Sequence, residues 1–339
     1  MRHMEPGVTI RREGPLTWIA GPAGFSHHGQ VVVGDTLWLT GNAYKDPVTY
    51  DTVYVGLGGD ERVVKEDQGV LPTMFVGPDG KLWGVVTNPY GDRDCEVVRP
   101  VGGHPHKGRK PFVGTPLWLD GNALVLLKVD PFSPDKPDRW MRYDLATEKA
   151  KVIKLPPPGG GKFLRNEEGI QCLARTQHRL LSPTGDVLRE RALALEGLAV
   201  QPVDLRFGYT STAVANDREA LWWLTIGADG TVARKELKTG PFYTLYPPQL
   251  AAEMLVVHYV DETGNGWVCI RDGQLISSVH STETGYIDGA GRTVIALPKA
   301  RWVLSGVSIL GGEIAAAVYE KDEKSHHPPA LCVALVPLT

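Results

Sequence analysis

The sequence predicts an all-β fold, a β-propeller with seven blades, and three observations lead to this prediction. Short apolar runs alternate with turns along the whole chain, which contains 39 Gly and 26 Pro. Apolar residues at helical spacing are scarce, and the best candidates are the short segments 193–200 and 248–254. A strand–turn–strand pattern also recurs about every 46 residues, a period typical of propeller blades with four short strands.

The repeat is clearest where the turn at 77–80 leads into Leu82 and Trp83. Related turns precede strands elsewhere, and we expect the aligned residue of each unit to open the second strand of a blade. A Trp at that position would fill the wedge between neighbouring blades. The aligned residues are Trp38, Trp83, Val125, Cys172, Trp222, Trp267 and Ala315.

We expect one propeller domain over 1–339, with blade units opening near 25, 70, 114, 162, 204, 251 and 300. The unit at Cys172 lacks both the Asp-Gly turn and the Trp, so six or eight blades also fit. A β-sandwich or a pair of barrels would explain the closely spaced turns, but neither needs the period. The last unit shows only three strands, and we expect the N-terminal strand 8–12 to complete it by pairing with 331–338.

Composition narrows the classes of function. The chain has 339 residues and a formal net charge of -3, which argues against a dedicated nucleic-acid binder. No apolar run is long enough for a membrane span, and no secretory signal is seen, so we expect a cytoplasmic or virion protein. The four cysteines are far apart and lie in apolar runs, which favours buried free thiols over disulfides.

Two segments resemble the Asp-x-x-Gly-x-Leu-Trp repeat of two-component-regulator and streptogramin lyase-like propellers. They are Asp79-Gly80-Lys81-Leu82-Trp83 and Thr263-Gly264-Asn265-Gly266-Trp267. The resemblance implies a propeller fold and carries little information about function.

The N-terminal Glu13-Gly14-Pro15, followed by Trp18, resembles the opening of gluconolactonase-like propellers. In that family the Glu is a metal ligand, so the resemblance makes Glu13 a candidate ligand. The Asn ligands that the family places before the segment equivalent to 77–80 are absent here.

Common catalytic motifs are missing, including Gly-x-Ser-x-Gly, His-Glu-x-x-His, the P-loop and Gly-x-Gly-x-x-Gly after a strand. An enzyme would then need inward-facing polar residues around a divalent metal at the central tunnel. The candidates for such a site are Glu13, Asn88, His258 and Asp261. Three histidine clusters, at 27–28, 104–106 and 326–327, lie in polar segments and are expected to be exposed loops.

In a propeller, the turns after each second strand and the links between blades lie on one face. Polar and charged loops on a rigid scaffold are where binding normally resides. The segment 104–110 is the most basic of the chain and would suit an acidic partner surface or a phosphate. The predicted binding residues are Tyr90, Arg93, Asp94, His104, His106, Arg109, Lys162 and Arg165.

These observations predict a non-enzymatic binding or assembly module, without a cofactor, that presents its loop face to a protein or glycan. A component of a viral or phage particle is one setting consistent with them. The alternative is a lactonase-like hydrolase or lyase with a divalent metal at the tunnel. Neither nucleic acid nor a membrane span is expected, and the oligomeric state is left open.

Overall fold

The structure is a computed structural model, and every regular element that it describes is a β-strand. The two segments with the best helical spacing are not helices: β18 begins at Ala199, and 249–251 forms a strand. Across the described part of the chain, no helix is long and apolar enough to cross a membrane. The described residues are 7–66, 71–77, 79–87, 97–101, 115–120, 122–128, 139–147, 149–153, 162–174, 176–182, 186–251, 253–298, 301–321 and 328–338.

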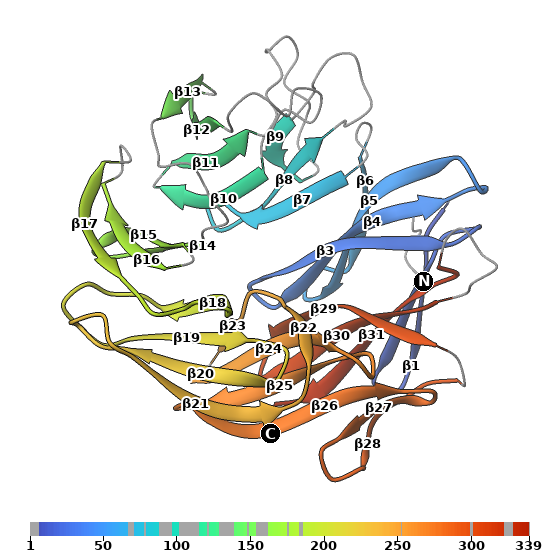
Figure 1. Ribbon diagram of the computed structural model, residues 1–339. Helices are drawn as coiled ribbons and strands as arrows, with labels where there is room; N and C mark the ends of the chain where they lie inside the picture. Colours follow the sequence, from blue (N-terminus) through green and yellow to red (C-terminus); the bar gives the residue numbers. More distant parts are fainter. Residues whose placement is uncertain are drawn as a thin grey trace.

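The described strands form seven antiparallel sheets, which Figure 1 shows in a ring, with β3, β7, β10, β14, β18 and β29 among the strands towards the centre. Four sheets have four strands each: β3 (Phe25–Val33), β4 (Thr36–Tyr44), β5 (Tyr50–Gly58) and β6 (Arg62–Glu66); β10 (Thr115–Asp120), β11 (Ala123–Lys128), β12 (Arg139–Asp144) and β13 (Lys149–Ile153); β14 (Lys162–Asn166), β15 (Gly169–Ala174), β16 (Gln177–Leu181) and β17 (Val187–Ala192); β18 (Ala199–Asp204), β19 (Ser211–Asn216), β20 (Ala220–Ile226) and β21 (Val232–Thr239).

The other three sheets differ in size. One has five strands in the order β1 (Thr9–Glu13), β2 (Leu16–Ala20), β31 (Leu331–Pro337), β30 (Glu313–Glu320) and β29 (Trp302–Leu310). One has three described strands, β7 (Leu71–Val76), β8 (Leu82–Thr87) and β9 (Val97–Pro100). One has seven, β22 (Phe242–Leu245), β23 (Gln249–Ala251), β24 (Met254–Asp261), β25 (Asn265–Arg271), β26 (Gln274–Thr282), β27 (Gly285–Asp288) and β28 (Thr293–Ala296).

The all-β propeller is confirmed, but the prediction of seven blades, with six or eight as alternatives, is wrong. Five sheets have the four or five strands of a regular blade, and the β7–β9 and β22–β28 sheets depart from that size. The β22–β28 sheet gains an outer hairpin, β27 and β28. Its innermost edge is split into β22 and β23, because Pro247 and Pro248 have no N–H to donate to the ladder.

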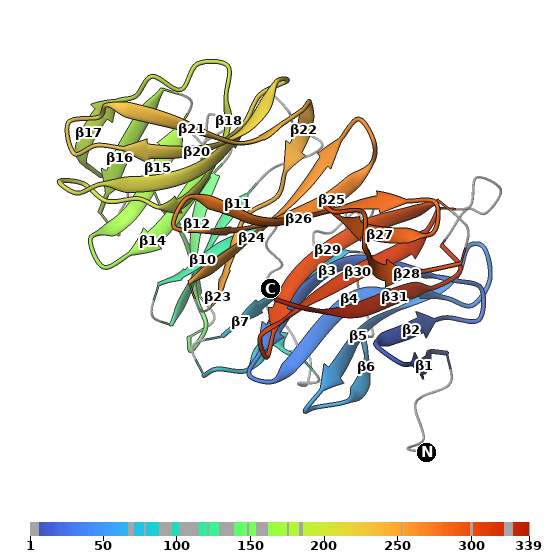
Figure 2. The ribbon, with the colours of Figure 1, turned by 90° about the horizontal axis from the view of Figure 1, so that it is seen from below.

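Both ends of the chain lie in one sheet, although not in the predicted register. The expected pairing of 8–12 with 331–338 is wrong, because β31 pairs with β2 and β1 lies one strand further out, as Figure 2 shows. The chain reverses between the two strands at Gly14, whose φ is 59°. Composition explains the order: β2 is largely apolar, whereas β1 reads Thr-Ile-Arg-Arg-Glu and is mostly exposed.

The tryptophans of the repeat do not share one position. Trp38 and Trp83 lie on second strands, whereas Trp222 and Trp267 lie on the third strands β20 and β25. The sequence alignment of units is therefore offset by one strand in the fifth and sixth sheets. Those sheets begin at Ala199 and Phe242, earlier than the predicted 204 and 251.

Two of the tryptophans donate a hydrogen bond to an Asp in the turn that precedes them. The Trp83 indole N–H donates to Asp79 Oδ1 over 3.0 Å, and that of Trp222 donates to Asp217 Oδ2 over 2.9 Å. Each Asp also accepts backbone N–H groups of its own turn. The Asp–Trp repeat therefore joins a turn to the strand that follows it. Of the four repeat tryptophans, only Trp38 and Trp267 are buried.

We expect Ile19→Ala to lower the free energy of unfolding by about 2–5 kcal/mol, as large-to-small core substitutions do. Ile19 is fully buried on β2, in the sheet that contains both chain ends. Denaturant unfolding measures the change. Arg12→Ala on β1 is the control: its ion pair with Glu61 is exposed, so the loss should stay below about 1 kcal/mol. Equal losses in the two variants would contradict this account.

Candidate functional site

A cleft of about 1020 Å³ opens between the β22–β28 sheet and the sheet that contains β29 and β30. Beneath it, the two sheets share one apolar core that includes Trp267 and Trp302. The cleft is at the upper end of the size range of small-molecule sites. Its lining residues are Tyr246, Val260, Asp261, Glu262, Thr263, Gly264, Asn265, Ser281, Thr282, Glu283, Arg301, Trp302, Val303, Leu304 and Lys321.

Strand direction explains why these residues meet. Antiparallel strands alternate in direction, so the turns after β24 and β26, the start of β29 and the end of β30 all lie at one edge of the ring. This is the edge that the sequence predicts for binding loops. The residues found there come from other sheets than Lys162 and Arg165, the two predicted binding residues that the structure describes.

Tyr246 reaches the cleft from the interruption between β22 and β23. Its backbone N–H still donates to the His258 carbonyl over 3.0 Å, before the two prolines end the ladder. The tyrosine and imidazole rings stack at 4.2 Å with an interplanar angle of 9°. Tyr246 is 42% exposed whereas His258 is 6% exposed, so the imidazole supports the inner face of an aromatic ring in the cleft wall.

His258 itself is a buried neutral base. Burial lowers the pKa of His258 to about 4. Its Nε2 atom is buried without a hydrogen-bond partner among the described residues. The sequence proposed His258 as a metal ligand, and the structure instead places it beneath Tyr246.

Asn265 is held rigidly at the base of the cleft. Its Oδ1 accepts from Tyr286 OH at 2.8 Å and from the Leu304 backbone N–H at 3.0 Å. Because Leu304 N can only donate, the amide orientation is fixed, and the Nδ2 group is a donor left for other partners. The contact with Leu304 also links β25 to β29 across the two sheets.

The cleft contains charges of both signs. Glu262 and Glu283 lie on its β22–β28 side, and Arg301 and Lys321 lie on the opposite side; all four are exposed. Asp261, a predicted metal candidate, uses Oδ1 to accept hydrogen bonds from the turn that follows it, including the backbone N–H groups of 263 and 264. Its role in the structure is therefore to shape that turn.

The structure does not bring the predicted metal candidates together. Glu13 is exposed on β1, far along the chain and in another sheet from His258 and Asp261. Over the described residues, no group of three or more His, Cys, Asp or Glu could hold a metal ion. Asn88 lies outside the described residues.

Two of the predicted binding residues, Lys162 and Arg165, are described, and both are exposed on β14 and remote from the cleft lining. The histidines at 326–327 lie outside the described part of the chain. The predicted binding residues that also lie outside it are Tyr90, Arg93, Asp94, His104, His106 and Arg109.

One histidine of the predicted clusters links two sheets. His27 Nδ1 lies 2.7 Å from Ser305 Oγ, and Gln30 Nε2 donates to Ser308 Oγ over 2.8 Å. These contacts join β3 of the first sheet to β29 of the last. His27 therefore has a structural role, while His28 beside it is exposed.

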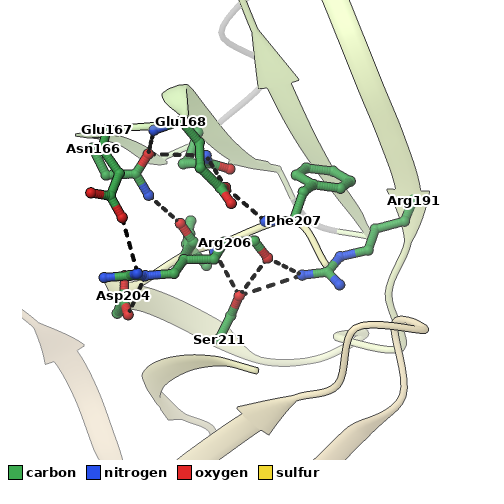
Figure 3. Close-up of polar contacts among 10 residues, drawn as sticks. Asn166, Glu167, Glu168, Arg191, Asp204, Arg206, Phe207 and Ser211 are labelled. Carbon is green, nitrogen blue, oxygen red and sulfur yellow. Dashed lines mark hydrogen bonds and ion pairs between the residues drawn. The ribbon is translucent and has the colours of Figure 1, made fainter. Parts of the chain in front are cut away.

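A second polar cluster lies between the β14–β17 and β18–β21 sheets (Figure 3). Arg191 donates to His178 Nδ1 and to the carbonyls of Gly227 and Arg206. His178 Nε2 must then be protonated, and it donates to Gln171 Oε1 over 2.8 Å. Glu168 accepts from the Phe207 N–H over 2.9 Å.

The hydrogen bonds of this cluster satisfy its own buried groups. Asn166 extends it by donating to the Leu205 carbonyl over 2.6 Å, and Ser211 links Arg191 to Arg206 in Figure 3. His178 and Gln171 are fully buried. We therefore assign the cluster to joining two sheets, and the cleft to binding.

The described cysteines are free and buried, as predicted. They are Cys172, Cys269 and Cys332. Burial raises the pKa of Cys172 to about 11 and that of Cys332 to about 12, so these thiols are poor nucleophiles.

Comparison with known proteins supports the fold. No protein-family model matches the sequence, and no curated protein sequence matches it. Among solved structures, the β-propeller domain of the trilobed protease from Pyrococcus furiosus is 11% identical, with a TM-score of 0.53 over 93% of this chain and 98% of that chain. The acylaminoacyl peptidase from Pyrococcus horikoshii is 11% identical, with a TM-score of 0.52 over 94% of this chain. This chain covers 52% of that peptidase.

A virginiamycin B lyase from Staphylococcus aureus is similar over 93% of this chain and 96% of its own, at 11% identity and a TM-score of 0.48. The β-propeller domain of the trilobed protease, with its TM-score of 0.53, confirms the predicted resemblance to propeller proteins. The protein is a β-propeller. At such low identity the likeness extends to the fold alone, because one fold serves many unrelated functions.

The sequence contained weak signals for the cleft residues. The run Tyr246-Pro247-Pro248 marks an interrupted strand, and Asn265 stands two residues before the Trp of the repeat. Nothing in the sequence shows that these segments meet Arg301 and Lys321.

Stability should fall as the pH drops below about 6.5, the usual pKa of histidine. Burial lowers the pKa of His178 to about 3 and that of His258 to about 4, so the folded protein keeps both neutral while the unfolded chain binds protons. Stability present above pH 6.5 is therefore lost progressively as the pH falls to about 4 for His258 and to about 3 for His178. Denaturant unfolding at several pH values measures this loss.

His258→Phe should reduce that loss, because Phe keeps the ring beneath Tyr246 and cannot titrate. Since His258 Nε2 has no partner among the described residues, the substitution removes no hydrogen bond from that atom. An unchanged pH dependence in His258→Phe would show that His258 is not responsible.

Proposed function

We propose that this protein is a binding module that holds a protein or glycan partner in the cleft between the β22–β28 and β29–β31 sheets. One observation carries the proposal. The cleft brings together the exposed ring of Tyr246, the fixed amide donor of Asn265 and side chains of both charges. It lies at the edge of the propeller where turns between strands meet. Convergent polar groups in a large cleft are typical of binding sites.

Rigidity supports the same proposal. Asn265 is fixed by hydrogen bonds from two directions, and Tyr246 is supported by a buried ring. A site whose side chains are already ordered loses less entropy when a partner binds. The expectation that the partner belongs to a viral or phage particle stays a prediction.

The proposal includes no resident metal. Elemental analysis of protein produced without a His tag tests this point. Stoichiometric metal retained after dialysis would favour the alternative, a metal-dependent hydrolase or lyase at the central tunnel.

Charge reversal in the cleft should weaken partner binding about tenfold or more, which corresponds to about 1.4 kcal/mol. The test variant is Glu262→Lys with Lys321→Glu, since both side chains are exposed cleft residues. The immobilised full chain is used to capture partners from extracts of the cells that produce it, and the captured species are quantified by mass spectrometry.

The control is Glu219→Lys with Lys149→Glu, which changes the same charges at exposed positions outside the cleft. Capture should be unchanged in this control. If the cleft variant captures the same species as well as the unsubstituted protein does, the cleft is not the binding site.

A further inference from the structure

We propose that the cleft binds a neutral oligosaccharide, stacked on the outer face of Tyr246 and hydrogen-bonded by Asn265 and Ser281. This inference rests on the proposed binding function and names the class of ligand. It follows from the flat ring, the uncharged hydrogen-bonding groups and the mixed charges of the cleft.

The first argument is the orientation of Tyr246. One face of its ring is covered by His258 at 4.2 Å, so its exposed surface belongs to the other face and the ring edge. The supporting imidazole projects from the central strand β24, which is paired on both sides. A flat ring fixed in this way offers an apolar surface that matches the C–H face of a pyranose.

The second argument is the supply of uncharged donors and acceptors beside that ring. Asn265 Nδ2 is a donor, since Oδ1 already accepts two hydrogen bonds. Ser281 Oγ accepts from the Asn265 backbone N–H over 3.2 Å, and its own proton has no acceptor among the described residues. Sugar hydroxyls donate and accept at once, so they can pair with both groups.

The third argument is the charge of the cleft. Three carboxylates, Asp261, Glu262 and Glu283, and two cations, Arg301 and Lys321, line it. With only one more carboxylate than cations, the cleft has no strong net field that would favour a polyanion or a polycation. Carboxylates can also accept hydrogen bonds from neighbouring hydroxyls, which a neutral sugar provides. These features together favour a neutral oligosaccharide over nucleic acid or a highly charged peptide.

The test is calorimetric titration of the full chain with neutral gluco-, galacto-, manno- and xylo-oligosaccharides. At least one of these series should bind. Tyr246→Ala should then raise its Kd about tenfold, the upper range for loss of one aromatic stacking contact, and Tyr246→Phe should change it less than about twofold. Tyr246→Leu, which keeps bulk without a flat ring, should resemble the Ala variant and guards against a packing effect.

Tyr243→Ala is the matched control, because Tyr243 is an exposed tyrosine on β22 that does not line the cleft. Its Kd should be unchanged. The unfolding transition of each variant shows whether it remains folded.

The outcomes separate this inference from the proposed function. If no series binds, or if binding does not depend on Tyr246, the oligosaccharide assignment is overturned. If no series binds and a captured protein partner depends on Glu262 and Lys321, the oligosaccharide inference is overturned and the binding function stands. Failure of both experiments would overturn both.

Discussion

The pairing of β2 with β31 is the contact on which the rest of the ring depends. It places the N-terminal hairpin and the last three strands in one sheet, with Leu16 opposite Ala334 and Ile19 opposite Leu331. That sheet then packs against the first sheet of the chain through apolar residues of both. Because these two sheets bury apolar faces against each other, loss of the pairing would leave apolar surface in water.

The cleft is a consequence of the same packing. β29 belongs to the sheet of the chain ends and contributes Leu304, whose backbone N–H holds Asn265. The shared core beneath the cleft keeps the two sheets together, so their edge turns meet at a defined distance. Stability and binding geometry therefore rest on one set of contacts between sheets.

The interrupted edge strand shows how a local defect becomes a site feature. Pro247 and Pro248 break the ladder between β22 and β23, and the residue just before them, Tyr246, stacks on a neighbouring strand's histidine. After the two prolines, Gln249 Nε2 donates to the Val307 carbonyl of β29 over 2.6 Å and so ties β23 to the neighbouring sheet. Hydrogen bonds therefore hold the chain on both sides of the interruption, and the Tyr246 ring lies in the cleft wall.

The sequence by itself determined the all-β class, the propeller repeat and the shared edge of the turns after each second strand. These follow from local chemistry: turn residues, strand propensity and alternating strand direction. It also placed His258 and Asp261 among the candidate residues, although the role it predicted, metal binding, is not supported by their positions.

Tertiary structure alone decided the strand order, the offset of the repeat and the site. Trp222 and Trp267 resemble Trp83 in sequence yet lie on third strands, because an Asp turn can precede any strand. Asn265 and Leu304 are 39 residues apart, and only the packing of two sheets brings them together. The physical reason is that burial and hydrogen bonds between sheets depend on register and neighbours, which short-range sequence patterns do not encode.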